Sequence, residues 1–296
     1  MGFLATQIMR GRWQAAGMAV GLALLSLFVP PISIVSSAAV ALVTLRLGAS
    51  EGLTVFGISV ATLTALGFLA GSVEFALFYG IILWLPIWVL AILLRAGRSL
   101  TLTIESAVLL GGLGILGFSL FKPDAVEMWK HLLMQMTPPE AALTMQPQVD
   151  KIAQYMTGII AAGTIFGWIF AMFLARWWQA QLYNPDGFRT EYLALSTSRS
   201  LALGSIGLIS LAALSSGEIS VLAWNLSILV VVLYTFVGTA VCHSLLAPLN
   251  QGRYLVIGFY MTVFLVPHLL IPVAMIGVSD AWWKLRQRVK VNSQNR

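Results

Sequence analysis

The residues best suited to chemistry lie in one stretch, residues 175–192, which reads ARWWQAQLYNPDGFRTEY. It places two arginines, an aspartate and a glutamate around the turn sequence Asn-Pro-Asp-Gly. Catalysis by such groups needs a nucleophile and a base that converge in a cleft, and no His or Cys stands nearby to supply them. We therefore interpret the stretch as a tight turn. Asn184 bonds its own backbone, Pro185 presets the first central residue and Gly187 tolerates the exit conformation.

Two tryptophans indicate where this turn lies. They follow an arginine at the end of an apolar run, and indole rings prefer the headgroup layer of a bilayer. We expect a helix that leaves the lipid here, on its inner side, and no catalytic residues. The predicted interfacial turn comprises Arg176, Trp177, Trp178, Asn184, Pro185, Asp186 and Gly187.

The other candidate polar groups stand singly within apolar runs. They are Asn225, His243 and His268, and the chain has one cysteine, Cys242. A metal site needs several such ligands at fixed spacing, so we expect none. A lone Asn or His in a membrane helix is more often a hydrogen bond to a neighbouring helix than a ligand or a proton carrier. We predict intramembrane polar contacts for these three residues.

Motifs for other chemistries are missing from the sequence. It has no G-x-x-x-x-G-K loop for phosphates, no H-E-x-x-H and no G-x-S-x-G. The net charge of +6 does not indicate nucleic acid, because the basic residues come in ones and twos beside apolar segments. We expect neither enzymatic activity, nor a cofactor, nor a nucleic-acid partner.

The composition predicts an all-α integral membrane protein. Apolar residues make up 59% of the chain and charged residues only 9%, which a soluble domain could not accommodate. Pro30 and Pro31 divide the first two apolar segments, which we expect to form a hairpin. We count nine segments, roughly 14–29, 32–47, 53–71, 75–95, 103–121, 153–175, 199–214, 220–244 and 254–279. The prediction is a polytopic helical bundle of eight to nine spans.

Positive charge favours a cytoplasmic amino terminus, because Lys and Arg are retained on the cytoplasmic side. That orientation places Arg10, Arg12, Arg46, Arg95, Arg98, Arg176, Arg189, Arg199 and Arg253 inside. Nine spans would leave Lys284, Arg286, Arg288 and Lys290 outside. Pro267 and Pro272 in the last segment could interrupt the helix and return the chain to the inner face. Eight full spans and one broken segment satisfy every charge.

The long loop after Lys122 predicts an amphipathic helix at about 122–137. Its apolar residues recur at helical spacing, and Thr-Pro-Pro-Glu at 137–140 then indicates a stop and a new helical start. This helix is expected to lie on the outer leaflet, either as a simple surface helix or as a lid over a binding site.

A resemblance adds a family to this interpretation. Residues 177–195, WWQAQLYNPDGFRTEYLAL, and 277–288, GVSDAWWKLRQR, resemble signatures of the uncharacterised bacterial YybS-like integral membrane protein family. That family is more distantly similar to the S components of energy-coupling-factor transporters and to the rod-shape protein MreD. The resemblance implies a six-helix, S-component-like fold over about residues 1–175, and it assigns no biochemical activity.

The first helix carries small residues where S components dock on a coupling subunit. Three alanines recur every fourth residue with two glycines beside them, and small residues allow close helix contact in lipid. The face comprises Ala15, Gly17, Ala19, Gly21 and Ala23. Its contact is either with a partner subunit or within the same chain. Residues 43–52, VTLRLGASEG, look like the corresponding turn of S components after a short second helix.

These observations predict three regions: residues 1–175 as the S-component-like part, 176–198 as a cytoplasmic turn and helix, and 199–296 as C-terminal helices with a basic tail. The expected setting is the bacterial cytoplasmic (inner) membrane. The expected role is binding of a small molecule or lipid, with transport by means of partner subunits. The alternative is a non-transporting scaffold that recruits envelope or other membrane factors. A carrier needs a cavity among the first six helices, whereas a scaffold can be packed solid.

Overall fold

The structure, a computed structural model, describes residues 2–249 and 251–286, and every regular element in them is a helix. The chain divides into two compact units. Unit 1 comprises Met1–Ala107 and Phe166–Ala194, and unit 2 comprises Val108–Ile165 and Leu195–Arg296. Two helices, α7 (Leu100–Phe121) and α10 (Met156–Tyr183), pass from one unit into the other. The boundaries of these units therefore differ from those of the predicted regions 1–175, 176–198 and 199–296.

Unit 1 is built around a short helix that is apolar on every side. The helix α3 (Ile32–Leu47) is buried from Ser36 through Leu45 and packs against its neighbours α2, α4 and α6. A helix without a polar face belongs in a core, which explains why its residues show no amphipathic pattern. The other elements of the unit are α1 (Gly2–Ile8), α2 (Arg12–Leu25), α4 (Ala49–Leu69), α5 (Glu74–Leu77), a π-helix η1 (Phe78–Trp84), α6 (Leu85–Gly97) and α11 (Gly187–Leu193). The predicted hairpin at Pro30 and Pro31 is confirmed by the contact of α2 with α3.

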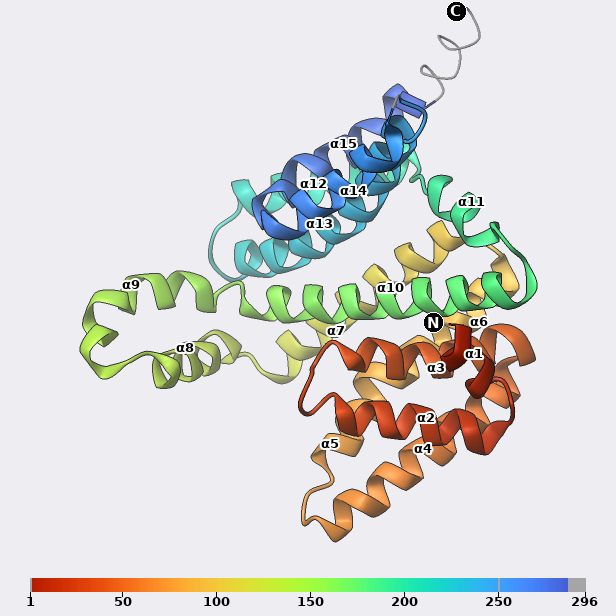
Figure 1. Cartoon of the computed structure of the whole chain (residues 1–296). Coiled ribbons are helices and arrows are strands. Elements are labelled where there is room, and N and C mark those ends of the chain that lie inside the picture. Colours follow the sequence, from red (N-terminus) through yellow and green to blue (C-terminus); the bar gives the residue numbers. More distant parts are fainter. Residues whose placement is uncertain (1, 250, 287–296) are drawn as a thin grey trace, which may run out of the picture. The chain divides into compact units, whose positions relative to one another are not determined.

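Unit 2 has a long central helix, α13 (Gly217–Leu246). Helices α12 (Arg199–Leu214) and α15 (Leu270–Trp283) both pack on it, and α14 (Gly252–Leu265) leads into a 3-10 turn η3 (Pro267–Leu269) before α15. A helical hairpin of α8 (Ala125–Met136), η2 (Pro139–Ala141) and α9 (Ala142–Ala153) belongs to the same unit (Figure 1). The predicted amphipathic helix at 122–137 is thus present as α8.

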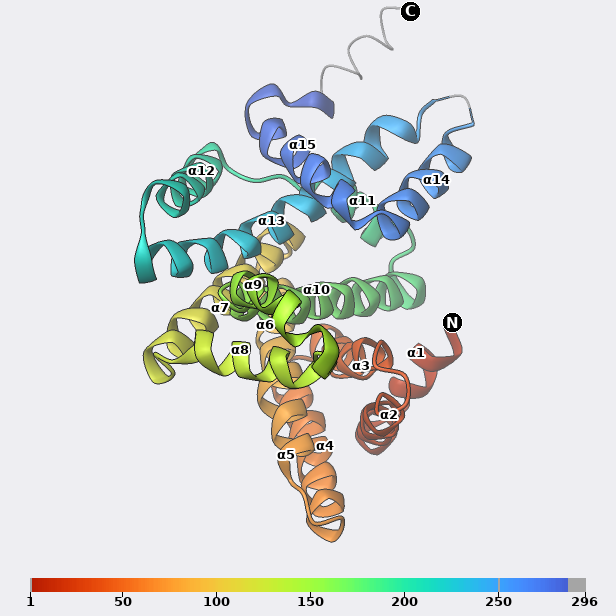
Figure 2. The ribbon, with the colours of Figure 1, turned by 90° about the vertical axis from the view of Figure 1, so that its left-hand side faces the viewer.

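The break predicted near Pro267 is confirmed. The chain bends by 110° between α14 and the helical segment Pro267–Trp283, so it turns back after α14 (Figure 2). Proline lacks the N–H that would continue the hydrogen-bond ladder, which accounts for the interruption. Each arm is too short by itself to cross a bilayer about 30 Å thick.

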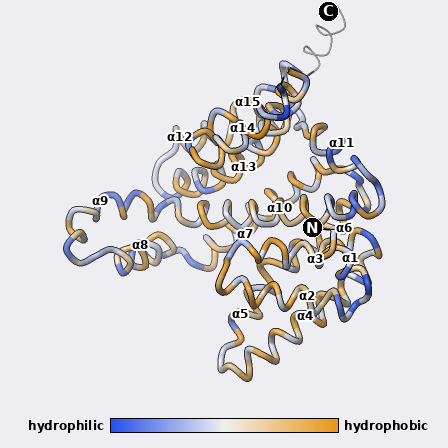
Figure 3. Tube along the Cα trace, viewed as in Figure 1, coloured by the Kyte–Doolittle hydropathy of each residue, from blue (hydrophilic) through white to orange (hydrophobic). Residues whose placement is uncertain are grey.

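Among the residues that the structure describes, five helical segments are long and apolar enough to cross a membrane, or six if the bent pair counts as one span. They are Ala49–Leu69, Glu74–Gly97, Leu100–Phe121, Met156–Tyr183 and Gly217–Leu246. The predicted count of eight to nine is higher because it includes α2, α3 and α12, whose 14, 16 and 16 residues rise only about 21–24 Å. Hydrophilic residues gather at helix ends and along the α8–α9 hairpin (Figure 3). The chain has the features of a multi-pass membrane protein.

Candidate ligand groove

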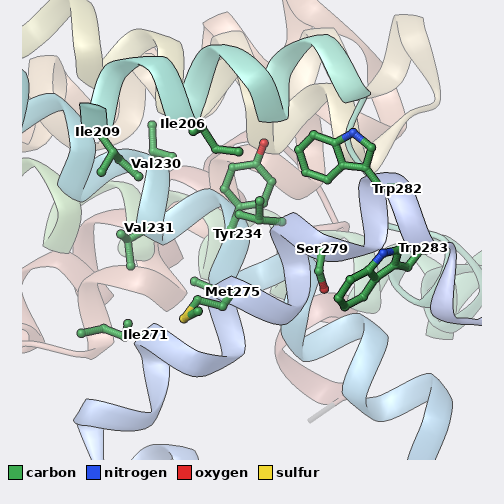
Figure 4. A pocket seen from close by; sticks show the side chains of 12 residues that line it. Ile206, Ile209, Val230, Val231, Tyr234, Ile271, Met275, Ser279, Trp282 and Trp283 are labelled. Carbon is green, nitrogen blue, oxygen red and sulfur yellow. The ribbon is translucent and has the colours of Figure 1, made fainter. Parts of the chain in front are cut away.

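An apolar groove runs along unit 2 between α12 and α15. Both helices rest on α13 and have few contacts with each other, so the groove lies where they diverge (Figure 4). Its volume is about 540 Å³, within the usual ~300–1,000 Å³ of ligand pockets. Its walls are formed by Ile206, Ile209, Val230, Val231, Tyr234, Ile271, Ala274, Met275, Val278, Ser279, Trp282 and Trp283.

The groove contains few polar atoms that could orient a ligand. The Tyr234 hydroxyl lies 3.4 Å from the hydroxyl of Ser205, and the Ser279 hydroxyl donates to the carbonyl of Ile276 at 2.8 Å. Both groups are therefore engaged within the protein. The lining favours a hydrocarbon chain over a polar metabolite, because apart from the indole N–H groups of Trp282 and Trp283 it offers mainly methyl, thioether and ring surface.

Glycines allow α13 and α15, two of the helices that form the groove, to pack closely. A Cβ atom added to Gly238 would lie 1.9 Å from the carbonyl oxygen of Val273, and one added to Gly277 would lie 2.3 Å from that of Tyr234. The two backbones thus touch directly where α15 crosses α13. Small residues permit such approach between membrane helices.

Basic residues surround the end of the groove that carries the two tryptophans. Arg199 at the start of α12 donates through Nε to the carbonyl of Ala281 at 3.3 Å, directly before Trp282. Lys284 follows Trp283 and is exposed. Arg286 donates to the Asp280 carboxylate at 2.7 Å and to the Leu195 carbonyl at 2.8 Å. The start of α12 and the end of α15 are therefore joined at this end.

Unit 1 has a small apolar gap in its interior. A gap bordered by α6, α7 and α10 residues, among them Leu90, Ile104 and Ile169, is too narrow to hold a water molecule. The groove of unit 2 lies in the last hundred residues, whereas a carrier built like an S component needs a cavity among its first six helices.

The predicted interfacial turn is held in place by a buried ion pair that the sequence did not predict. Arg176 is only 8% exposed, and its guanidinium makes a two-pronged ion pair with Glu191 of α11 at 2.6 and 2.9 Å. Asn184 and Arg176 both lie close to the Cα of Gly187, where a Cβ would meet their nitrogens at 2.5 and 2.9 Å. Asp186 adopts a positive φ of 64°. The ion pair thus fastens the turn and α11 to the last turns of α10, while Pro185 stays exposed.

The prediction for Trp178 was wrong. Its side chain is 1% exposed and packs inside unit 1, and its indole nitrogen has no hydrogen-bond partner among the described residues. Helix α10 presents one face to the unit, and Trp178 falls on that face together with Ala171 and Ala175. Trp177, one residue earlier, is half-exposed and can still lie in the headgroup layer.

Removing the partners of this ion pair should show a measurable coupling. We expect a double-mutant cycle of Arg176→Met and Glu191→Gln to give a coupling of about 2 kcal/mol in the free energy of unfolding, because one partner is buried. Unfolding in detergent, followed by circular dichroism, measures it. The matched control is the exposed pair Arg12–Glu51, whose coupling should be clearly smaller. Equal couplings would mean that the buried pair does not fasten the turn.

The small-residue face of α2 separates into two parts. Ala15, Ala19 and Ala23 are fully buried, and the carbonyl of Ala19 accepts a hydrogen bond from Ser36 of α3 at 2.7 Å. Contact within the chain, one of the two possibilities, therefore accounts for the alanines. Gly17 and Gly21 are exposed, with open space where a Cβ would stand.

Two of the three candidate polar residues contact a neighbouring helix in the structure. Asn225 is 3% exposed and bonds the Gly158 N–H at 2.5 Å and the Gln154 carbonyl at 2.7 Å, which links α13 to the start of α10. His243 of α13 lies 3.1 Å from the Tyr260 hydroxyl of α14. His268 is exposed in η3, at the break of the last segment, and makes no hydrogen bond to another described residue.

Polar contacts join α8 to α9 within the hairpin and join α8 to the start of α10. The Trp129 indole donates to the Thr157 hydroxyl at 2.8 Å, and Lys130 pairs with Asp150 at 2.9 Å. The hydrogen bond and charge of Asp150 raise the pKa of the Lys130 ammonium. Apolar side chains such as Met136 and Leu143 stay exposed, as expected of a hairpin on a membrane surface.

Sequence reasoning missed the groove residues. Ile206, Met275 and Val278 belong to helices whose faces are all apolar, so no pattern separates a groove wall from a lipid-facing side. The one available signal was the Trp-Trp-Lys sequence at 282–284, which is typical of a membrane interface. Comparison of the chain with family models, with curated proteins and with solved structures found no match.

Proposed function

We propose that this protein binds a lipid or another amphipathic molecule in the groove between α12 and α15, within the bacterial inner membrane. The observation that carries the proposal is a space of about 540 Å³ with almost purely apolar walls. Each methylene buried there contributes about 0.8 kcal/mol relative to water, so a hydrocarbon chain is the ligand that such walls favour. Membership of the YybS-like family and an S-component-like front half remain part of this proposal.

The basic end of the groove supports an inner-side position. Arg199 and Arg286 bond to residues 281 and 195, so the start of α12 and the end of α15 lie on the same side of the membrane. Lys and Arg are retained on the cytoplasmic side. The broken helix pair thus brings the carboxyl-terminal charges to the side that Arg199 and the amino terminus are proposed to occupy. Arg288 and Lys290 of the predicted basic tail lie outside the described residues.

Filling the groove tests the proposal. We expect Val278→Trp to lower the amount of lipid that stays bound through purification in mild detergent by tenfold or more, because the indole occupies the volume. Native mass spectrometry measures the bound lipid. The matched control is Leu203→Trp on α12, an exposed site that does not line the groove and should leave lipid binding unchanged. Equal lipid retention in both variants would contradict the proposal.

A scaffold is the second candidate, and the packing of unit 1 favours it. The buried run from Ser36 through Leu45 of α3 and the narrow gap near Leu90 show tight packing around α3 and α6. A tightly packed protein binds through its surface, and the exposed Gly17 and Gly21 of α2 are available there to a helix of another subunit. Affinity purification that yields stoichiometric membrane proteins without bound lipid would favour this candidate over the first.

A further inference from the structure

We infer that the groove selects an anionic phospholipid, whose phosphate is bound by Arg199 and Lys284 at the tryptophan end. This inference rests on the proposed function, since it names the class of molecule that the groove takes. It is carried by two independent features of the same end of unit 2: uncompensated positive charge and interfacial aromatic side chains.

The described residues do not neutralise the positive charge at this end. Asp280 is 6% exposed and already bonds the Arg286 side chain and the Leu285 N–H, at 2.7 and 2.9 Å. Arg199 and Lys284 form no ion pair with any other described residue. Two cations therefore lie near the tryptophan end of the groove, and no carboxylate among the described residues pairs with them.

Arg199 is placed to act on a headgroup and not only to hold the fold. Its Nε is committed to the carbonyl of Ala281, which fixes the guanidinium beside Trp282. That bond leaves the two Nη groups to donate, and a guanidinium binds phosphate oxygens in a two-pronged manner. Lys284, which directly follows Trp283 at the end of α15, adds a second positive charge at the same end of the groove.

The tryptophans give the depth at which this phosphate would lie. Trp282 and Trp283 form part of the groove wall, and the Trp283 side chain is 59% exposed (Figure 4). Indole rings concentrate at the headgroup level, where the hydrocarbon ends. An acyl chain that lies along Ile206, Ile271 and Met275 would therefore reach its glycerol and phosphate at the tryptophan end, beside Arg199 and Lys284. A zwitterionic headgroup carries a cationic group beside its phosphate, which Arg199 and Lys284 repel, whereas an anionic headgroup has no such cation.

The test compares two lipids with identical acyl chains and different headgroups. Purified, delipidated protein is titrated with phosphatidylglycerol or with phosphatidylcholine, and native mass spectrometry gives both affinities. We expect phosphatidylglycerol to bind more tightly. Arg199→Gln and Lys284→Gln should each weaken its binding about fivefold, and about twentyfold together, since each basic residue contributes about that factor near anionic lipid. Phosphatidylcholine binding should fall by a clearly smaller factor, because its choline cation offsets its phosphate, and the binding that remains shows that the groove is intact.

Lys151→Gln is the matched control, because it removes one exposed cation from α9 and should leave the preference intact. Equal affinity for the two lipids in the unaltered protein would overturn the inference while the groove proposal stands. A preference that survives the double variant, or that Lys151→Gln reduces equally, would also overturn it. The proposed function itself fails if neither lipid binds the unaltered protein. It also fails if the Val278→Trp variant binds both lipids as tightly as the unaltered protein does. A lipid-free dimer that Val278→Trp abolishes would show a second copy as the occupant.

Discussion

Gly238→Ala is expected to destabilise unit 2 by about 3 kcal/mol. The added Cβ would stand 1.9 Å from the Val273 carbonyl oxygen, which is backbone and has no rotamer to adopt. Helices α13 and α15 must separate, and overpacking of this kind costs about 1–3 kcal/mol or more. The midpoint of unfolding in a denaturing detergent, followed by circular dichroism, measures the loss.

Gly204→Ala is the control for this experiment. Gly204 lies on α12 with open space around the position of its missing Cβ, and alanine is the better helix former by about 1 kcal/mol. That substitution should therefore leave stability unchanged or raise it. The Gly238→Ala variant should also bind less lipid, because α15 forms one wall of the groove. A Gly238→Ala protein as stable as the Gly204→Ala protein would show that the α13–α15 contact is looser than the structure has it.

The parts of the fold that depend on local chemistry could be predicted from the sequence. Pro267 interrupts the last helix because proline removes a hydrogen bond in any surroundings, and α8 was visible because its apolar residues recur at helical spacing. The hydrogen bonds of Asn225 and His243 followed from the cost of an unpaired polar group in lipid.

The parts that depend on which apolar face meets which partner could not be predicted. Lipid and a protein core are equally apolar, so burial leaves no mark on residues such as Ala15 or Val278. Trp178 shows the same difficulty for an amphipathic side chain, because its neighbour Trp177 has the same type but lies on the other side of α10. The groove exists through the divergence of two helices on a third, which is a tertiary feature with no local signature.

Asn225→Leu is expected to release the start of α10 from α13 at a cost of about 2 kcal/mol. The Gly158 N–H belongs to the first turn of α10, where no carbonyl of the same helix is available to it. Asn225 Oδ1 accepts that N–H at 2.5 Å, while its Nδ2 donates to the Gln154 carbonyl at 2.7 Å. Leucine has a similar volume and can satisfy neither group, so both remain unpaired in an apolar setting.

Hydrogen exchange distinguishes this local release from a general loss of stability. In the Asn225→Leu variant the amide of Gly158 should exchange at least tenfold faster, while the amides in the middle of α13 keep their protection. The control is Ser227→Ala, since the Ser227 hydroxyl bonds only to the Ala223 carbonyl of its own helix. Its removal should affect neither helix. Asn225→Asp retains an acceptor for Gly158 but has no donor for Gln154, so an intermediate effect is expected. Unchanged exchange at Gly158 in the leucine variant would show that the Asn225 side chain does not cap α10. The contact of the two helices would then depend on the close approach of Gly158 to the α13 backbone.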